Sequence, residues 1–117
     1  MYVEPNKPAY AAEVEHTLEG EQRAVKGMIE CIYCHDDNTC VVANEEAKLI
    51  GMEGNRRFGD GNSIIAGPFF VVGLEGDGFR SLTEEEQAKY LQEYAEPEQI
   101  SQEEVEADTG MTIIAFR

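Results

Sequence analysis

The sequence predicts an α+β fold: a small antiparallel or mixed sheet of about five to six strands, with two main helices packed on it. Short apolar runs, continuous or alternating, recur between turn residues, as in strands. Two other segments each begin with a threonine cap and have helical spacing. With 117 residues, 42% of them hydrophobic, the chain has the size of one domain with a modest core. We expect residues 1–96 to form this α+β domain and residues 97–117 to form an acidic connector and a C-terminal strand. This strand is expected to pack on the same domain or on a neighbouring subunit.

The N-terminal third predicts two strands and a helix. Residues 2–4 are expected to form a short strand, and a proline-containing turn leads into a second strand over residues 10–15, where apolar and acidic residues alternate. Thr17 is expected to cap a helix that extends to about Lys26. Leu18 and Val25 lie seven residues apart on its apolar face, and Gly27 is the expected C-terminal stop.

The middle of the chain predicts the centre of the sheet. Residues 28–34 and 39–43 are β-rich runs that flank a turn, which predicts a hairpin. Asn44 is expected to end the second strand and to cap a short helical turn. Four glycines indicate a loop over residues 51–61. Residues 63–72 are mostly apolar on both faces, as in a central strand, with a bulge or an unpaired side expected at Pro68.

The last third predicts a strand, a helix and an acidic end. Residues 79–82 are expected to form a short strand. Thr83 and Glu86 have the spacing of a capping box, which predicts a helix to about Tyr94. Residues 98–108 are polar, and residues 111–116 are β-rich. Because an unpaired β-rich segment favours aggregation, we expect it to add to a sheet edge, either its own or that of a neighbouring subunit.

Five segments, in this order, carry a family resemblance. They are VEPNKP (residues 3–8), TLEGEQRAVKGMIE (17–30), NEEAKLIGMEGNRRF (44–58), IIAGPFFVVG (64–73) and FRSLTEEEQAKYL (79–91). The chain resembles the domain-of-unknown-function family numbered 3846. The resemblance implies a small protein of phages, plasmids or conjugative elements of gut bacteria, and it carries no assigned activity. Ala47 stands where the family pattern NEEGK has a glycine, which puts a close approach at this position in doubt.

The charge balance excludes one class of partner. The chain has 24 acidic against 9 basic residues, a formal net charge of −15, which repels phosphate backbones. We therefore expect no direct nucleic-acid binding. An acidic surface is common in soluble proteins, but it also suits a nucleic-acid mimic or a protein that docks a basic partner. No export signal and no apolar run of about 18 residues is present, so no membrane segment and a cytoplasmic location are expected.

The three cysteines, Cys31, Cys34 and Cys40, are an odd number, which argues against a secreted disulfide framework. Together with His35 they could supply four zinc ligands, and residues 31–35 spell a haem-attachment motif. The compressed spacing and the strand context instead favour free thiols packed within strands. No metal and no cofactor is therefore expected.

The best candidates for contact with a ligand or a partner are Asn44, Glu45, Glu46, Asn55, Arg56 and Arg57. The arginines could bind an anion or a partner carboxylate, with the asparagines orienting it. The alternative is internal: Asn44 caps a turn, and one arginine pairs with Glu45 or Glu46 to hold the loop on the sheet. No catalytic residues can be assigned, and no enzymatic activity is expected.

Three functions follow from these observations. The leading hypothesis is a cytoplasmic, non-enzymatic accessory protein of a mobile genetic element that acts through contacts with an unknown protein, with a homodimer through the C-terminal strand as a further arrangement. The alternative is an acidic nucleic-acid mimic that inhibits a DNA-binding enzyme such as a restriction system. It is suggested by ten acidic residues against one basic residue, Lys89, between residues 83 and 108. The third is an enzyme that uses the polar segment 44–57.

Overall fold

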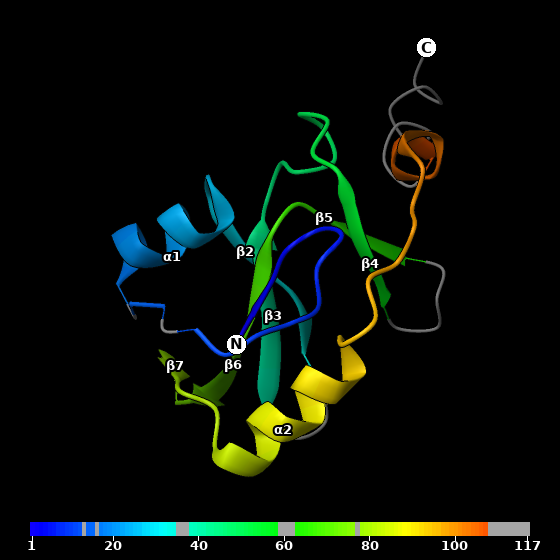
Figure 1. Ribbon diagram of the computed structural model, residues 1–117. Helices are drawn as coiled ribbons and strands as arrows, with labels where there is room; N and C mark the ends of the chain where they lie inside the picture. Colours follow the sequence, from blue (N-terminus) through cyan, green and yellow to red (C-terminus); the bar gives the residue numbers. More distant parts are fainter. Residues whose placement is uncertain (13, 16, 35–37, 59–62, 77, 108–117) are drawn as a thin grey trace.

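A computed structural model describes residues 1–12, 14, 15, 17–34, 38–58, 63–76 and 78–107. These residues form two helices and seven strands, joined by a third, short helix at residues 102–107 (Figure 1). The elements are β1 (Tyr2–Val3), α1 (Leu18–Val25), β2 (Ile29–Cys34), β3 (Thr39–Asn44), β4 (Gly54–Phe58), β5 (Ser63–Ala66), β6 (Phe69–Glu75), β7 (Gly78–Arg80) and α2 (Glu84–Glu93).

The strands form two antiparallel sheets. The larger sheet has five strands in the order β1-β6-β3-β2, with β7 also paired to β6. β1 and β7 follow one another along the β6 edge that faces away from β3, because β1 pairs at Phe69–Phe70 and β7 pairs from Gly73 onward. The smaller sheet is the β4–β5 hairpin. The predicted α+β class is confirmed, although the strands divide between two sheets.

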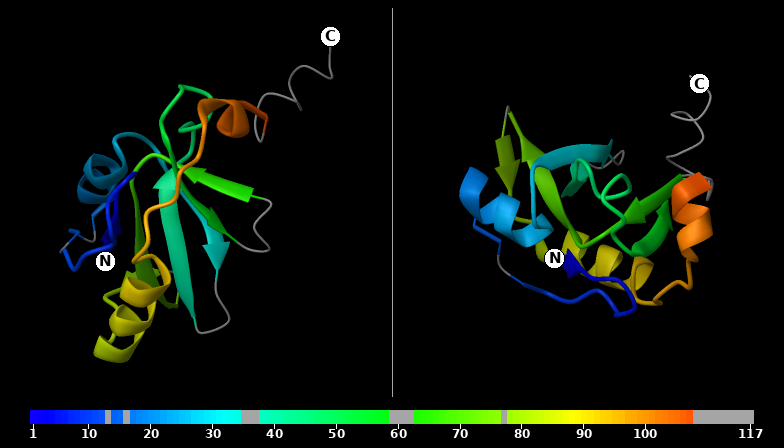
Figure 2. Two further views of the ribbon diagram at one scale, coloured as in Figure 1. Left: turned by 45° about the vertical axis from the view of Figure 1, so that its right-hand side comes forward. Right: turned by 90° about the horizontal axis from the view of Figure 1, so that it is seen from above.

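The five-stranded sheet is covered by a helix on each face (Figure 2). Alternate residues of β3 and β6 point to opposite sides. One side packs with Val25 of α1, in a cluster of Val25, Cys40, Val42, Phe70 and Val72. The other side packs with Tyr90 and Tyr94, in a cluster that includes Val3, Val41, Ala43, Phe69 and Val71. Burial of each large apolar side chain is worth about 1.5–3 kcal/mol, which explains why residues 40–43 of β3 and 69–72 of β6 are apolar on both faces.

Both helices begin where the sequence predicts. The Thr17 side chain accepts a hydrogen bond from the Gly20 amide at 3.0 Å, and the Thr83–Glu86 capping box is formed. At the end of α1, Lys26 and not Gly27 takes the left-handed conformation, with φ of 63°. Gly27 is needed for a different reason: a Cβ there would lie 2.5 Å from the Asn44 side-chain nitrogen.

The apolar face expected for the first helix is only partly correct. Val25 is fully buried, whereas Leu18 is 57% exposed. The helix contacts the sheet cluster through Ala24 and Val25 at its C-terminal end, and Leu18 lies at the opposite end of the helix.

Two predictions in the middle of the chain are wrong. Residues 63–72 are not one strand, because Gly67, with φ of 72°, and Pro68 separate β5 from β6 and send them to different sheets. Residues 51–61 are not all loop either, since β4 lies within them. The first residue of β4 is a glycine, Gly54, because Ile100 packs closely against it. A Cβ at this position would lie 2.6 Å from the Ile100 side chain.

The strand expected over residues 10–15 is reduced to a single pairing. Tyr10 exchanges backbone hydrogen bonds of 2.9 and 3.1 Å with Tyr2. The described residues that follow, Ala11, Ala12, Val14 and Glu15, belong to no strand.

The free-thiol prediction is wrong for two of the three cysteines. Cys31 and Cys40 form a disulfide that joins β2 to β3, with Cα atoms 6.4 Å apart. The register of the hairpin shifts between Cys31 and Tyr33, so the simple alternation that the prediction assumed does not hold. His35 lies outside the described residues, among which no group of three or more metal-ligating side chains occurs.

Residues beyond α2 pack on the β4–β5 hairpin. Val105 of the short helix is fully buried, together with Ala47, Ile64 and Ala66. The expected strand at residues 111–116 lies outside the described residues. No helix in the described part of the chain has the length and apolar character needed to cross a bilayer.

The disulfide gives a first test. A Cys31→Ser variant is expected to lose about 2–3 kcal/mol of unfolding free energy, because the bond no longer restricts the unfolded chain. Urea denaturation of the two proteins measures this loss. As a control for the pairing, thiol alkylation of the wild type in denaturant should modify one cysteine without reductant and all three after reduction. Modification of three cysteines without reductant would contradict the assignment.

Candidate functional site

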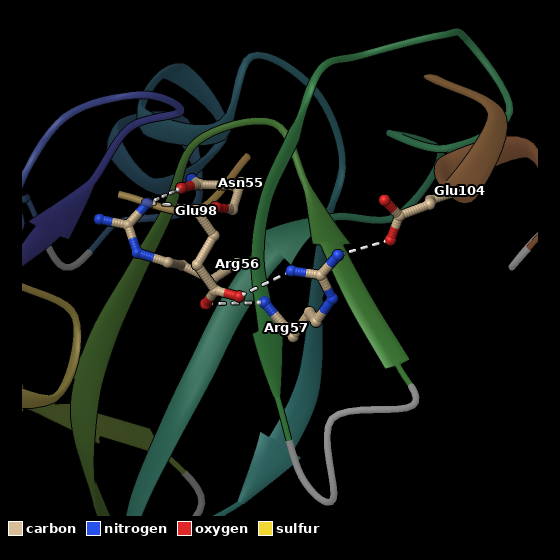
Figure 3. Close-up of polar contacts among 5 residues, drawn as sticks. All are labelled: Asn55, Arg56, Arg57, Glu98 and Glu104. Carbon is tan, nitrogen blue, oxygen red and sulfur yellow. Dashed lines mark hydrogen bonds and ion pairs between the residues drawn. The ribbon is translucent and has the colours of Figure 1, made fainter. Parts of the chain in front are cut away.

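Arg56 in β4 is a buried cation that binds backbone oxygen atoms, and Figure 3 shows its contact with Asn55. Its side chain is 1% exposed. Nη2 donates to the carbonyl oxygens of Lys7 at 2.6 Å and Tyr94 at 2.8 Å. Nη1 donates to the backbone oxygen and to Oδ1 of Asn55, at 3.1 and 2.7 Å. Arg56 thus connects the N-terminal segment, β4 and the residue that ends α2.

Asn55 extends the same network. Its Nδ2 donates to the carbonyl oxygens of Val3 at 3.0 Å and Gly67 at 2.9 Å, and the side chain is fully buried. Asn55 therefore joins β1 to the residue at which β5 and β6 separate. The side-chain amide of Asn55, which the sequence offered for orienting a ligand, is therefore used in binding other parts of the protein.

The electrostatic setting of Arg56 is that of a structural cation. Burial lowers the pKa of its guanidinium, while the nearby Glu98 and Tyr94 act in the opposite direction. Its Nε has no hydrogen-bond partner among the described residues, but both terminal nitrogens bind protein oxygens. Since the donors that could grip an anion bidentately are already engaged, we interpret Arg56 as a clamp between segments.

Arg57 binds two acids of the C-terminal connector (Figure 3). Its Nη1 lies 3.1 Å from Glu98 Oε1, and its Nη2 lies 2.5 Å from Glu104 Oε2. These bonds raise the pKa of Arg57 and lower the pKa of Glu104. Glu98 also accepts the Arg57 backbone amide at 3.2 Å. The expected pairing of an arginine with Glu45 or Glu46 is thus replaced by pairing with acids about 40 residues further along the chain.

Asn44 has a capping role, as expected from the sequence. Its Oδ1 accepts the Glu46 amide at 2.8 Å, which starts the turn at residues 45–51. Its Nδ2 donates to the carbonyl oxygens of Val25 and Lys26 at 3.1 and 3.2 Å, so it also binds the C-terminal end of α1.

The 45–51 turn presents two large apolar side chains to solvent. Leu49 is 59% exposed and Ile50 is 58% exposed, and the neighbouring Glu45 and Glu46 are also exposed. The turn is held by Ile50 N–H to Glu46 O at 3.0 Å, and by burial of Ala47 in the cluster beneath it. The residue that replaces the family glycine therefore packs its methyl group into a core.

The six candidate residues do not converge on one site. Asn55 and Arg56 bind the N-terminal segment, Gly67 and the end of α2. Arg57 binds the connector, and Asn44 supports the turn on which Glu45 and Glu46 are exposed. Leu49 and Ile50 were missed by the sequence analysis. The available signal was a pair of adjacent aliphatic residues within a turn flanked by acids.

Comparison with known families adds one finding. A family model described as "Domain of unknown function (DUF3846)" matches residues 1–95. The chain belongs to this family. No curated protein and no solved structure matches the sequence. The match of this DUF3846 protein includes Asn55, Arg56 and the 45–51 turn, and it ends before Glu98 and Glu104, the partners of Arg57.

Replacement of Arg56 tests its role as a clamp. Arg56→Met is expected to lower the unfolding free energy by about 3 kcal/mol or more, because several buried carbonyl oxygens lose their donor. Arg57→Met, which removes a partly exposed arginine from the same strand, is the matched control and should cost clearly less. Chemical denaturation measures both, and an equal loss for the two variants would contradict the assignment.

The Arg57–Glu104 pair predicts an acid-dependent contribution to stability. The pKa of Glu104 is lowered below its ordinary value of 4.5, so the folded state favours the ionised carboxylate. This contribution is fully present above the ordinary value and is lost as the pH falls below it through the lowered pKa. Glu104→Gln should therefore reduce the melting temperature at pH 7 but make little difference in strong acid. A deficit that persists in strong acid would mean that the charge is not responsible.

Proposed function

We propose that this DUF3846 protein is a non-enzymatic, cytoplasmic accessory protein of a mobile genetic element, and that it acts by binding another protein through the 45–51 turn. The observation that carries the proposal is the exposure of Leu49 and Ile50, 59% and 58%, on a turn that is anchored from below. Adjacent exposed apolar side chains favour burial against a partner, and contiguous apolar patches on a surface mark interaction sites.

The surroundings of the two side chains define the partner. Glu45, Glu46 and Glu53 are exposed near them along the chain, and the protein as a whole has a net charge of −15. A complementary surface would have an apolar pocket for Leu49 and Ile50 with basic residues at its rim. Because backbone hydrogen bonds and the burial of Ala47 hold the turn, binding would require little additional ordering.

The polar residues of β4 support binding over catalysis. The donor groups of Asn55 and the terminal nitrogens of Arg56 bind protein oxygens, as described above. A residue that serves as a clamp inside the fold is poorly placed to bind and release a substrate. The mobile-element context rests on the family resemblance.

A nucleic-acid mimic is the second candidate, and exposed acids on and after α2 favour it. Glu84, Glu85, Glu93, Glu96 and Glu103 are all exposed. A mimic also needs a continuous row of free charges, and three acids of this region are engaged internally: Glu86 binds Arg80 at 2.7 Å, and Glu98 and Glu104 bind Arg57. The interruption makes this function the weaker of the two.

A double variant, Leu49→Ser with Ile50→Ser, tests the proposed surface. It should bind the partner at least about tenfold more weakly, while its melting temperature stays within about 2 °C, since both side chains are exposed. Leu18→Ser is the matched control, because Leu18 is 57% exposed on a different element and its loss should leave binding unchanged.

The measurement is affinity capture from a bacterial host lysate, followed by titration of the purified captured protein against all three forms. Equal affinity of the double variant would contradict the proposed surface. Capture of a DNA-processing enzyme by the double variant, with release at high salt, would instead support the mimic.

A further inference from the structure

A groove of about 880 Å³ lies at the edge of the five-stranded sheet. Tyr10, Ala12, Val14 and Glu15 form one wall together with α1, and the β7–α2 connection with the first turns of α2 forms the other. Its floor contains Phe70 and Val72 of β6, which are 0% and 4% exposed. This volume falls within the range of known binding sites. The groove exposes about as much polar as apolar surface, above a floor of two apolar side chains.

One wall of the groove carries backbone that no described residue pairs. Tyr10 pairs with Tyr2 through two backbone bonds. Beyond it, the described part of the chain supplies no hydrogen-bond partner for the backbone of Ala11, Ala12 or Val14. Ala12 and Val14 also line the groove and are half-buried. Backbone of this kind beside a groove with apolar residues on its floor is a template for an added strand.

The C-terminal sequence has the chemistry of such a strand. Residues 111–116, MTIIAF, combine β-branched and aromatic residues, and Arg117 follows them. The floor of the groove offers apolar residues, Phe70 and Val72, to such a strand. The acids near the groove are already paired, because Glu15 binds Arg23 of the same lining at 2.9 Å and Glu4 binds Lys7 at 3.6 Å. The match to residues 111–116 therefore rests on strand chemistry and not on charge.

We propose that the groove receives residues 111–116 of a second copy of this chain, so that two copies exchange their C-terminal strands. A second copy is required by the position of the connector. The helix at residues 102–107 lies on the opposite side of the molecule from α1 in each view (Figures 1 and 2). Only three residues separate position 107 from position 111, so the Cα atoms of these two positions lie at most about 14 Å apart. Exchange between two copies fills both grooves under two-fold symmetry.

Two full-length variants test the contact from its two sides. Ala12→Trp fills the groove, and Ile114→Glu puts a charge into the inserted strand. Each variant should have the mass of one chain in sedimentation equilibrium, where the wild type has the mass of two. Ala11→Trp is the matched control, because Ala11 is exposed and does not line the groove. Ser81→Trp is a second groove-filling variant, at an exposed position of the other wall, and guards against misfolding of Ala12→Trp.

Mixing the two variants gives the decisive result. Ala12→Trp retains an intact strand and Ile114→Glu retains an intact groove, so an equimolar mixture should form a mixed dimer although neither variant dimerises alone. Circular dichroism and melting curves should show that every variant is folded. The proposal is overturned if the wild type has the mass of one chain at all concentrations, if either variant remains a dimer, or if the mixture stays monomeric.

Discussion

The arrangement of the fold depends on one buried guanidinium. Arg56 donates to the carbonyl oxygen of Tyr94, which also accepts the amide of Ala9 at 3.2 Å, so the end of α2 and the N-terminal segment meet at one oxygen atom. The last turn of α2 has no basic residue of its own. Arg56 therefore supplies, from another element, the positive charge that stabilises the C-terminal end of a helix. Its bonds to Lys7 and Asn55 fix the position of that charge.

The parts of the fold that follow from local chemistry were predictable. Thr17 and Thr83 cap helices through amides only three residues away, and β3 and β6 are apolar because both faces of the sheet are covered by helices. The partners of Arg56 are 49 and 38 residues away and are backbone carbonyls, which every residue has. No sequence pattern distinguishes the two that are used, so this network could not be found from spacing.

The candidate site was predictable in its residues but not in their roles. Asn55, Arg56 and Arg57 stood out correctly as constrained polar groups, yet the choice of Glu98 and Glu104 among 24 acids depends on how the connector packs through Val105. Leu49 and Ile50 were missed because aliphatic residues are ordinarily assigned to a core. Their exposure is decided by the turn that buries Ala47 instead. The disulfide was missed because a register shift in β2 changes which residues face each other.

The internal contacts also determine which surfaces remain available for partners. Arg57 and Val105 bind the connector to the β4–β5 hairpin, and the connector leaves the groove at the opposite edge uncovered by any described residue of this region. The Cys31–Cys40 disulfide joins β2 to β3, and Asn44 binds both the C-terminal end of α1 and the start of the 45–51 turn. The polar and covalent bonds that stabilise the domain thus leave two features at its surface, an exposed apolar turn and a groove with apolar residues on its floor. Burial of apolar surface is the main driving force of association, so these two features would supply affinity in the proposed complexes, and the negative charge would select among partners.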